Sequence, residues 1–137
     1  MYPAHLVAPM SEDLTAHGFE GLETPAAVES VMENKDGTML LVVNSVCGCA
    51  AANARPGAKM AMQHGKTPDR AVTVFAGVNR EATERAREFL LPYPPSSPSI
   101  ALFKDGKLVH FIERHSIEGR SANVIAENLK MAFDRYC

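Results

Sequence analysis

The segment Cys47-Gly48-Cys49 holds the two residues whose types and spacing are best suited to chemistry, because paired thiols exchange disulfides and bind metals. It lies between residues 39–43, an apolar run typical of a strand, and residues 50–62, an alanine-rich run typical of a helix. We therefore expect both cysteines on a strand-to-helix turn, where free backbone N–H groups and the helix dipole stabilise negative charge. A thiolate is such a charge, so this position predicts a lowered cysteine pKa.

The charged residues around this segment favour a thiolate as well. Residues 38–68 include no Asp or Glu, whereas they include three basic residues, Arg55, Lys59 and Lys66. We expect Arg55 to favour an anionic thiol ligand, whereas Lys59 fits a solvated helix face better. Gly48 is expected to keep the turn open and to let the two sulfurs approach each other.

Three kinds of site are compatible with two cysteines at this spacing. Buried, inert thiols are the least favoured, because small core cysteines rarely flank a glycine on a turn. A metal or iron–sulfur site needs about four ligands, usually in two pairs. The one other cysteine is Cys137, and the five histidines show no ligand spacing. Dithiol–disulfide chemistry is favoured. Its usual spacing is Cys-x-x-Cys, but the position of the two cysteines on a strand-to-helix turn strengthens this interpretation. The disulfide ring closed by Cys-x-Cys is smaller than that of Cys-x-x-Cys, which predicts a more oxidising couple.

Length and composition restrict the class of protein. The 137 residues are expected to form one domain, residues 1–137, and the hydrophobic content of 46% is ordinary for a soluble globular protein. A net charge of −2 argues against a nucleic-acid partner. No apolar run has the length of a membrane span, and no signal peptide is evident, so we expect no membrane partner and a cytoplasmic location.

The first half of the chain predicts two helices, a buried strand and the helix that follows the cysteines. Residues 2–10 are expected to form an irregular arm, because they are apolar and contain two prolines. Capping residues and helix breakers set the other boundaries. The expected elements are a helix from Ser11 to Gly18, a helix capped by Thr24 with Pro25 first, a central strand over 39–43, and a helix kinked at Pro56 and ended by Gly65.

The second half predicts a strand, a helix, a hairpin and a last helix. Residues 92–99, rich in proline and serine, are expected to form a shaped loop before the hairpin. The expected elements are a strand over 70–76, a helix from Asn79, a hairpin of 100–103 and 107–112 around Asp105-Gly106, and a helix capped by Ser121 with Val124, Ile125, Leu129 and Phe133 inward. A strand–helix–strand unit followed by a hairpin gives an α/β fold, a mixed sheet with helices on both faces.

This order of elements resembles the thioredoxin-like fold, a three-layer α/β/α architecture with a mixed central sheet. In that fold the redox cysteines follow the first central strand and open a kinked helix, as we expect for Cys47 and Cys49. A proline before the antiparallel hairpin faces the cysteines, and its peptide bond is cis. The resemblance therefore implies that Pro98 faces the cysteines and that the Ser97–Pro98 bond is cis.

Longer motifs make the resemblance more specific. They are the Asn-Ser-Val-Cys-Gly-Cys block within residues 43–51, then residues 54–56, 66–69, 72–77, 95–99, 109–112, Arg114-His115, 117–119 and the last cysteine. Together they resemble the bacilliredoxin family over essentially the whole chain. The resemblance implies a small cytoplasmic thiol-disulfide oxidoreductase that removes bacillithiol from mixed disulfides on client proteins, and some members have been discussed as disulfide isomerases. It implies no cofactor, with bacillithiol or a similar low-molecular-weight thiol as co-substrate.

The residues and the resemblance agree on roles. Cys47 is expected to attack the mixed disulfide, and Cys49 is expected to resolve the adduct. Cys137 is expected to be dispensable, and His115 is interpreted as a surface or core-edge residue rather than a proton donor. The expected substrate-binding residues are Gly48, Ser97, Pro98 and Arg55. The alternative function is a metal or iron–sulfur carrier that uses all three cysteines.

Overall fold

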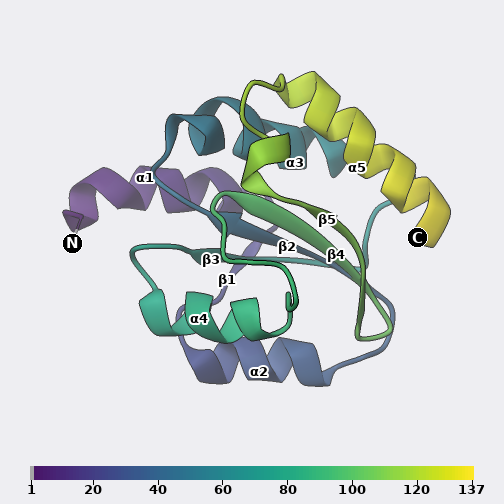
Figure 1. Ribbon diagram of the computed structural model, residues 1–137, viewed down its shortest axis with the longest axis horizontal. Coiled ribbons are helices and arrows are strands. Elements are labelled where there is room, and N and C mark those ends of the chain that lie inside the picture. The colour runs from purple at the N-terminus through teal and green to yellow at the C-terminus, as the bar shows by residue number, and fades with distance from the viewer. Residues whose placement is uncertain (1) are drawn as a thin grey trace.

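Strand β2 (Thr38–Asn44) is the centre of the fold, because all seven of its residues are buried. In the computed structural model, which describes residues 2–137, β2 pairs in parallel with one neighbour and antiparallel with the other. A strand can be buried on both faces only if helices cover both faces of its sheet. The apolar run therefore dictates the layered architecture seen in Figure 1.

Four further strands complete a mixed five-stranded sheet of order β1-β3-β2-β4-β5. They are β1 (Glu20–Gly21), β3 (Arg70–Phe75), β4 (Ser99–Lys104) and β5 (Lys107–Ile112). Strands β1, β3 and β2 run parallel, whereas β4 and β5 form the predicted antiparallel hairpin. The turn of that hairpin holds Asp105 and Gly106 at φ angles of 51° and 81°, as a two-residue type I′ turn requires. The two-residue edge strand β1 was not predicted.

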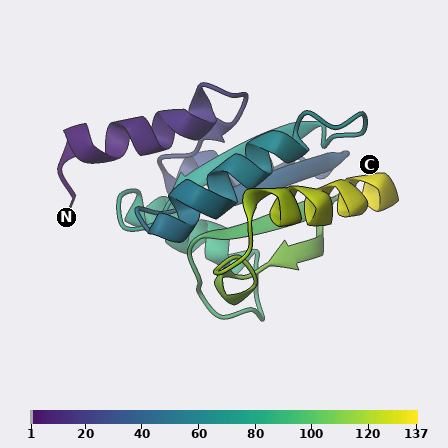
Figure 2. The same cartoon turned by 90° about the horizontal axis from the view of Figure 1, so that it is seen from above.

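Helices cover the two faces of the sheet, which confirms the predicted three-layer α/β/α fold. They are α1 (Ala4–Thr15), α2 (Pro25–Glu33), the π-helical turn η1 (Ala50–Ala54), α3 (Arg55–Ala61), α4 (Arg80–Glu88), the 3-10 turn η2 (Arg114–Ser116) and α5 (Ala122–Tyr136). Figures 1 and 2 show α2 and α4 on one face and α1, α3 and α5 side by side on the other. Among residues 2–137, no helix has the length and apolarity to cross a membrane.

Alternate residues of β2 enter two separate hydrophobic cores, as the period of a strand requires. Leu40 and Val42 pack in the core beneath α1, α3 and α5, together with Phe133. Leu41 and Val43 pack in the core beneath α2 and α4. Because β2 joins both cores, the position of its carboxyl end, where the cysteines follow, is fixed from both sides of the sheet.

The expectation of an irregular arm over residues 2–10 is wrong, because α1 begins at Ala4 and continues through Pro9 to Thr15. A proline inside a helix removes one backbone hydrogen bond but does not prevent the helix on either side of it. Val7 and Leu14, two turns apart, are both buried, so they hold one face of α1 against the sheet. Burial of that face outweighs the missing bond.

The helix after the cysteines is irregular just ahead of Pro56, next to the position where a kink was predicted. The backbone N–H of Arg55 donates to the carbonyl of Ala50, five residues earlier, which defines the π-helical turn η1. Pro56 has no N–H, and its ring would clash with the carbonyl four residues before it in a regular helix. The wider turn accommodates this proline near the start of α3. The helix ends at Ala61, before the predicted stop at Gly65.

Helices α3 and α5 approach each other closely at Gly57. A Cβ atom built there would lie 2.7 Å from the Ile125 side chain and 3.2 Å from the backbone oxygen of Ala122. Ser121 caps α5 as predicted, because its side chain accepts a hydrogen bond from the Val124 N–H at 3.2 Å. Val124 itself is 52% exposed, so its predicted inward orientation is wrong. The buried face of α5 follows Ile125, Leu129 and Phe133 instead.

Candidate functional site

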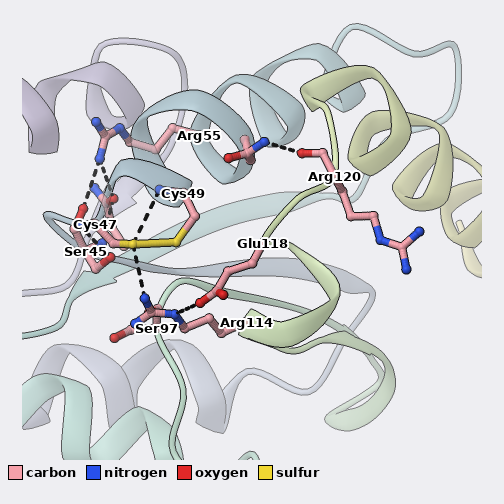
Figure 3. The surroundings of a disulfide bond; sticks show 10 residues. Ser45, Cys47, Cys49, Arg55, Ser97, Arg114, Glu118 and Arg120 are labelled. Carbon is pink, nitrogen blue, oxygen red and sulfur yellow. Dashed lines mark hydrogen bonds and ion pairs between the residues drawn. A yellow bond between two sulfur atoms is a disulfide. The ribbon is translucent and has the colours of Figure 1, made fainter.

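Cys47 and Cys49 form a disulfide at the carboxyl end of β2, where the chain turns into the helix (Figure 3). The Cys47 N–H donates to the Ser45 hydroxyl at 3.2 Å, and the Cys49 N–H donates to the Cys47 Sγ at 3.4 Å. The Ala50 N–H donates to the Cys47 carbonyl at 2.9 Å, which begins the helical turn. The Cys47 sulfur therefore accepts a backbone hydrogen bond at the helix start, where negative charge is favoured.

The two cysteines differ in their surroundings. A surface groove of about 390 Å³, here called the Cys47 groove, is lined by residues that include Cys47, Ser97, Arg114, Arg87, Gly77 and Tyr2. Cys49 is not among the described residues that line it, and it packs instead against the core beneath α3 and α5. Gly48 is exposed, and among the described residues no atom beyond its chain neighbours lies within 4 Å of a Cβ built there. The glycine is thus not needed for packing, but it leaves the surface beside the sulfurs uncovered.

The loop before β4 lies at the same end of the sheet as the disulfide. Val43 of β2 pairs with Ser99 of β4, so the Ser97–Pro98 bond lies just beyond the paired residues. This bond is cis, as predicted. Pro98 is buried, and of the two residues it is Ser97 that lines the Cys47 groove.

Arg114 contacts the Cys47 sulfur, a contact that sequence reasoning missed. Its Nη2 lies 3.4 Å from the Cys47 Sγ, its Nη1 donates to the Ser97 carbonyl at 3.3 Å, and its Nε is paired with Glu118 (Figure 3). A guanidinium at this distance stabilises a thiolate and bridges the cysteine turn to the loop. The sequence signal that could have indicated this contact is the position of Arg114 shortly after β5, because the end of β5 pairs with the start of β4.

Arg55 lies behind the turn, which contradicts its expected contact with a thiol ligand. Its side chain is 6% exposed, and its Nε donates to the Asp13 carboxylate at 3.1 Å. Its Nη1 donates to the Asn44 side-chain oxygen at 3.0 Å and to the Ser45 carbonyl at 3.1 Å. Arg55 therefore connects α1 to the backbone just ahead of Cys47, and it positions the turn rather than a ligand.

The Asp13 carboxylate forms ion pairs with both basic residues of α3, Arg55 and Lys59. Lys59 donates to the second Asp13 oxygen at 2.5 Å, so it forms an ion pair rather than lying on a purely solvated face. Partial burial would raise the pKa of the Asp13 carboxyl. The hydrogen bonds and charges of Lys59 and Arg55 together outweigh burial and hold that pKa below its usual range.

Cys137 is remote from the other two cysteines. Its thiol lies by Thr38 and Asp69, at the opposite end of β2 from Cys47, and burial raises the pKa of this thiol above its usual value. No three His, Cys, Asp or Glu side chains within residues 2–137 converge as metal ligands. A carrier site built from all three cysteines is therefore contradicted. The His115 side chain is 75% exposed and lies 4.0 Å from Glu113.

The fold has clear counterparts among solved structures. A thioredoxin from Fasciola hepatica is 20% identical, with a TM-score of 0.60 over 87% of this chain and 100% of that chain. Mitochondrial thioredoxin 3 from Saccharomyces cerevisiae is 17% identical, with a TM-score of 0.60 over 90% of this chain and 98% of that one. A disulfide at the end of the central strand, beside a cis-proline loop, defines this chain as a redox-type protein of the thioredoxin fold.

Sequence comparison gives the family. A family model described as disulphide isomerase matches residues 2–137. A bacilliredoxin from Cytophaga hutchinsonii is 60% identical over 134 residues, 98% of each chain, and one from Halalkalibacterium halodurans is 52% identical over 136 residues, 99% of this chain and 94% of that protein. The chain belongs to the bacilliredoxin family and is a thiol-disulfide oxidoreductase.

Proposed function

We propose that this protein removes a low-molecular-weight thiol, bacillithiol or a similar one, from mixed disulfides on client proteins. The observation that carries the proposal is the asymmetry of the disulfide. Cys47 opens into the groove beside Arg114, whereas Cys49 packs against the core. A groove of about 390 Å³ falls in the size range of small-molecule sites.

In the first step, the Cys47 thiolate of the reduced protein attacks the thiol-derived sulfur of the mixed disulfide. A new bond joins that sulfur to Cys47, and the client sulfur leaves as a thiolate that takes up a proton. Arg114 and the Cys49 N–H stabilise the attacking thiolate, because both contact the Cys47 sulfur. Ser97 lines the groove that receives the incoming disulfide.

In the second step, the Cys49 thiolate attacks the Cys47 sulfur and the low-molecular-weight thiol leaves. The two electrons come from the dithiol, which becomes the disulfide seen here. Two further thiols, or a dithiol reductase, then restore the reduced form. The proposed partners are S-thiolated cytoplasmic proteins and the thiol itself, with no organic cofactor and no membrane or nucleic-acid partner.

Disulfide isomerisation is a second candidate function, and the description of the matching family model supports it. It needs the same attack by Cys47, directed at a disulfide between two client cysteines. Reactivation of a scrambled ribonuclease by the reduced protein tests this activity. A Cys49→Ser variant keeps the attacking thiol but loses the resolving one, so it should stall on the client.

Trapping tests the principal proposal. The Cys49→Ser variant, recovered from its native cells under thiol-blocking conditions, should carry a low-molecular-weight thiol on Cys47 detectable by mass spectrometry. The Cys47→Ser variant should carry none on Cys49, and Cys137→Ser should behave as the parent. Adducts on Cys49 alone, or no transfer from a thiolated client in vitro, would refute the proposed order of attack.

A further inference from the structure

The Cys47 groove contains a second arginine, Arg87, that the exchange steps do not use. It comes from the last turn of α4, on the face of the sheet opposite the helix that follows the cysteines. Its Nε atom is buried and has no hydrogen-bond partner among residues 2–137. A buried donor without a partner costs free energy. Because the Nε is shielded from solvent, only the terminal Nη groups of Arg87 can meet a ligand in the groove, and no ion pair within residues 2–137 engages this guanidinium.

The charge of Arg87 is also incompletely compensated. Burial lowers the pKa of its guanidinium, and this effect outweighs the opposing charge of Glu84. Arg114, by contrast, is paired with Glu118, and Arg85 on the same helix is paired with Glu29 and Glu88. An anion that entered the groove would therefore meet one arginine that forms no ion pair within residues 2–137.

The groove is shaped for a small molecule beside this arginine. Gly77 forms part of its wall with a φ of 84°, and a Cβ there would lie 3.2 Å from the Tyr2 ring. Because Gly77 has no side chain, the Tyr2 ring approaches its backbone closely and closes the groove on the side of α1. A guanidinium presents donors in a planar fork that matches a carboxylate, so the chemistry of Arg87 selects a carboxylate over an amine.

We propose that Arg87 anchors a carboxylate of the low-molecular-weight thiol while its sulfur is joined to Cys47. This inference rests on the proposed function and names the class of thiol, one with a carboxylate on the part remote from sulfur. Arg87 is a specificity residue: it distinguishes anionic from cationic thiols and leaves the reacting sulfurs to Cys47, Cys49 and Arg114.

One test measures charge selectivity in the exchange reaction. A single-cysteine peptide is prepared as a mixed disulfide with glutathione, which bears carboxylates, or with cysteamine, which bears none. For the reduced parent and for Arg87→Gln, single-turnover release of each thiol is followed. We expect Arg87→Gln to slow glutathione release about tenfold, equivalent to about 1.4 kcal/mol, and to leave cysteamine release within about twofold. Arg87→Lys should fall between the parent and Arg87→Gln.

The matched control is Arg85→Gln, which removes an arginine from the same helix but outside the described lining of the groove. It should leave both rates and their ratio unchanged. If Arg87→Gln slows both substrates equally, or neither, Arg87 does not select the thiol and the proposal is overturned. Equal slowing identifies Arg87 as a structural residue of the groove.

A binding measurement separates this proposal from the proposed function. S-methylglutathione cannot exchange, so its binding to the oxidised protein, followed by amide shifts around Gly77 and Cys47, depends only on the groove. The parent should bind it and Arg87→Gln should bind it at least about fivefold more weakly. Binding without any exchange activity would refute the proposed function alone. Equal binding by parent and variant would refute the carboxylate anchor.

Discussion

Replacement of Arg114 by glutamine should raise the pKa of the Cys47 thiol. The guanidinium lies 3.4 Å from the sulfur, and a unit charge at that distance stabilises a thiolate by about 1.2 kcal/mol in a water-like dielectric. That screening is appropriate because the Arg114 side chain is 46% exposed. This attraction corresponds to about 0.9 pKa unit. Since Glu118 offsets part of the charge, we expect a rise of about 0.4 to 0.8 unit.

Alkylation kinetics measure this pKa directly. The background is Cys49→Ser with Cys137→Ser, so that Cys47 is the one thiol, and the rate of reaction with iodoacetamide is followed against pH. The control is Arg120→Gln, because Figure 3 shows the Arg120 side chain directed away from the disulfide. In the variant with Arg114 intact, the midpoint should lie below about 8.5, the value for a free cysteine.

Two outcomes would refute the reasoning. A midpoint at or above about 8.5 with Arg114 intact would show that neither the helix start nor the arginine stabilises the thiolate. An equal shift in Arg114→Gln and Arg120→Gln would assign the effect to the general positive charge of the region. In that case the contact in the structure would have no specific electrostatic role.

Three further predictions follow from contacts outside the groove. Cys137→Ser should leave thiol release unchanged, whereas Cys47→Ser should abolish it, because Cys137 lies at the opposite end of β2. Gly57→Ala should lower the free energy of unfolding by about 1–3 kcal/mol in urea titrations, because the added methyl meets Ile125 at 2.7 Å. Asp13→Asn should destabilise the protein near neutral pH. The pKa of Asp13 is lower in the folded than in the unfolded protein, so the ionised carboxylate stabilises the fold fully above the unfolded pKa of about 3.9. This stabilisation is lost as the pH falls through the folded pKa.

Each of these three predictions has a control variant or a result that would contradict it. Gly48→Ala adds the same methyl where nothing lies within 4 Å, so it should change stability far less than Gly57→Ala. The stability difference between parent and Asp13→Asn should narrow on acidification, and a constant difference from pH 7 to pH 3 would contradict the ion-pair explanation. Loss of activity in Cys137→Ser as complete as in Cys47→Ser would require a third thiol in the mechanism.

The central strand and the cysteine turn could be predicted from the sequence, because their signals are local. An apolar run followed by a helix-forming run specifies where Cys47 lies, and β2 occupies the predicted position. Helix α1 could not be predicted in full, because the residues that hold it, Val7 and Leu14, stabilise it through burial against a distant part of the chain. Pro9 is a local signal that tertiary packing overrides.

The partners of Arg55 and Arg114 could not be predicted either, because these partners are distant in the sequence. Arg55 is close to the cysteines in sequence but turns toward Asp13, 42 residues away. Arg114 is 67 residues from Cys47 and contacts its sulfur. Sequence proximity thus pointed to Arg55, although Arg114 is the arginine that lies against the Cys47 sulfur. The register of β4 with β2 and β5 brings Arg114 to the cysteine turn.

The position of α1 has a practical consequence for work with this protein. The Asn44 side chain donates to the Met10 carbonyl at 3.1 Å, and its oxygen accepts from Arg55 and from the Ser45 N–H. Tyr2, ahead of α1, lines the Cys47 groove itself. An affinity tag or fluorescent protein fused ahead of Tyr2 would therefore be attached close to the redox centre. A fusion after Cys137 would emerge at the far end of the central strand and leave the disulfide open to its substrates.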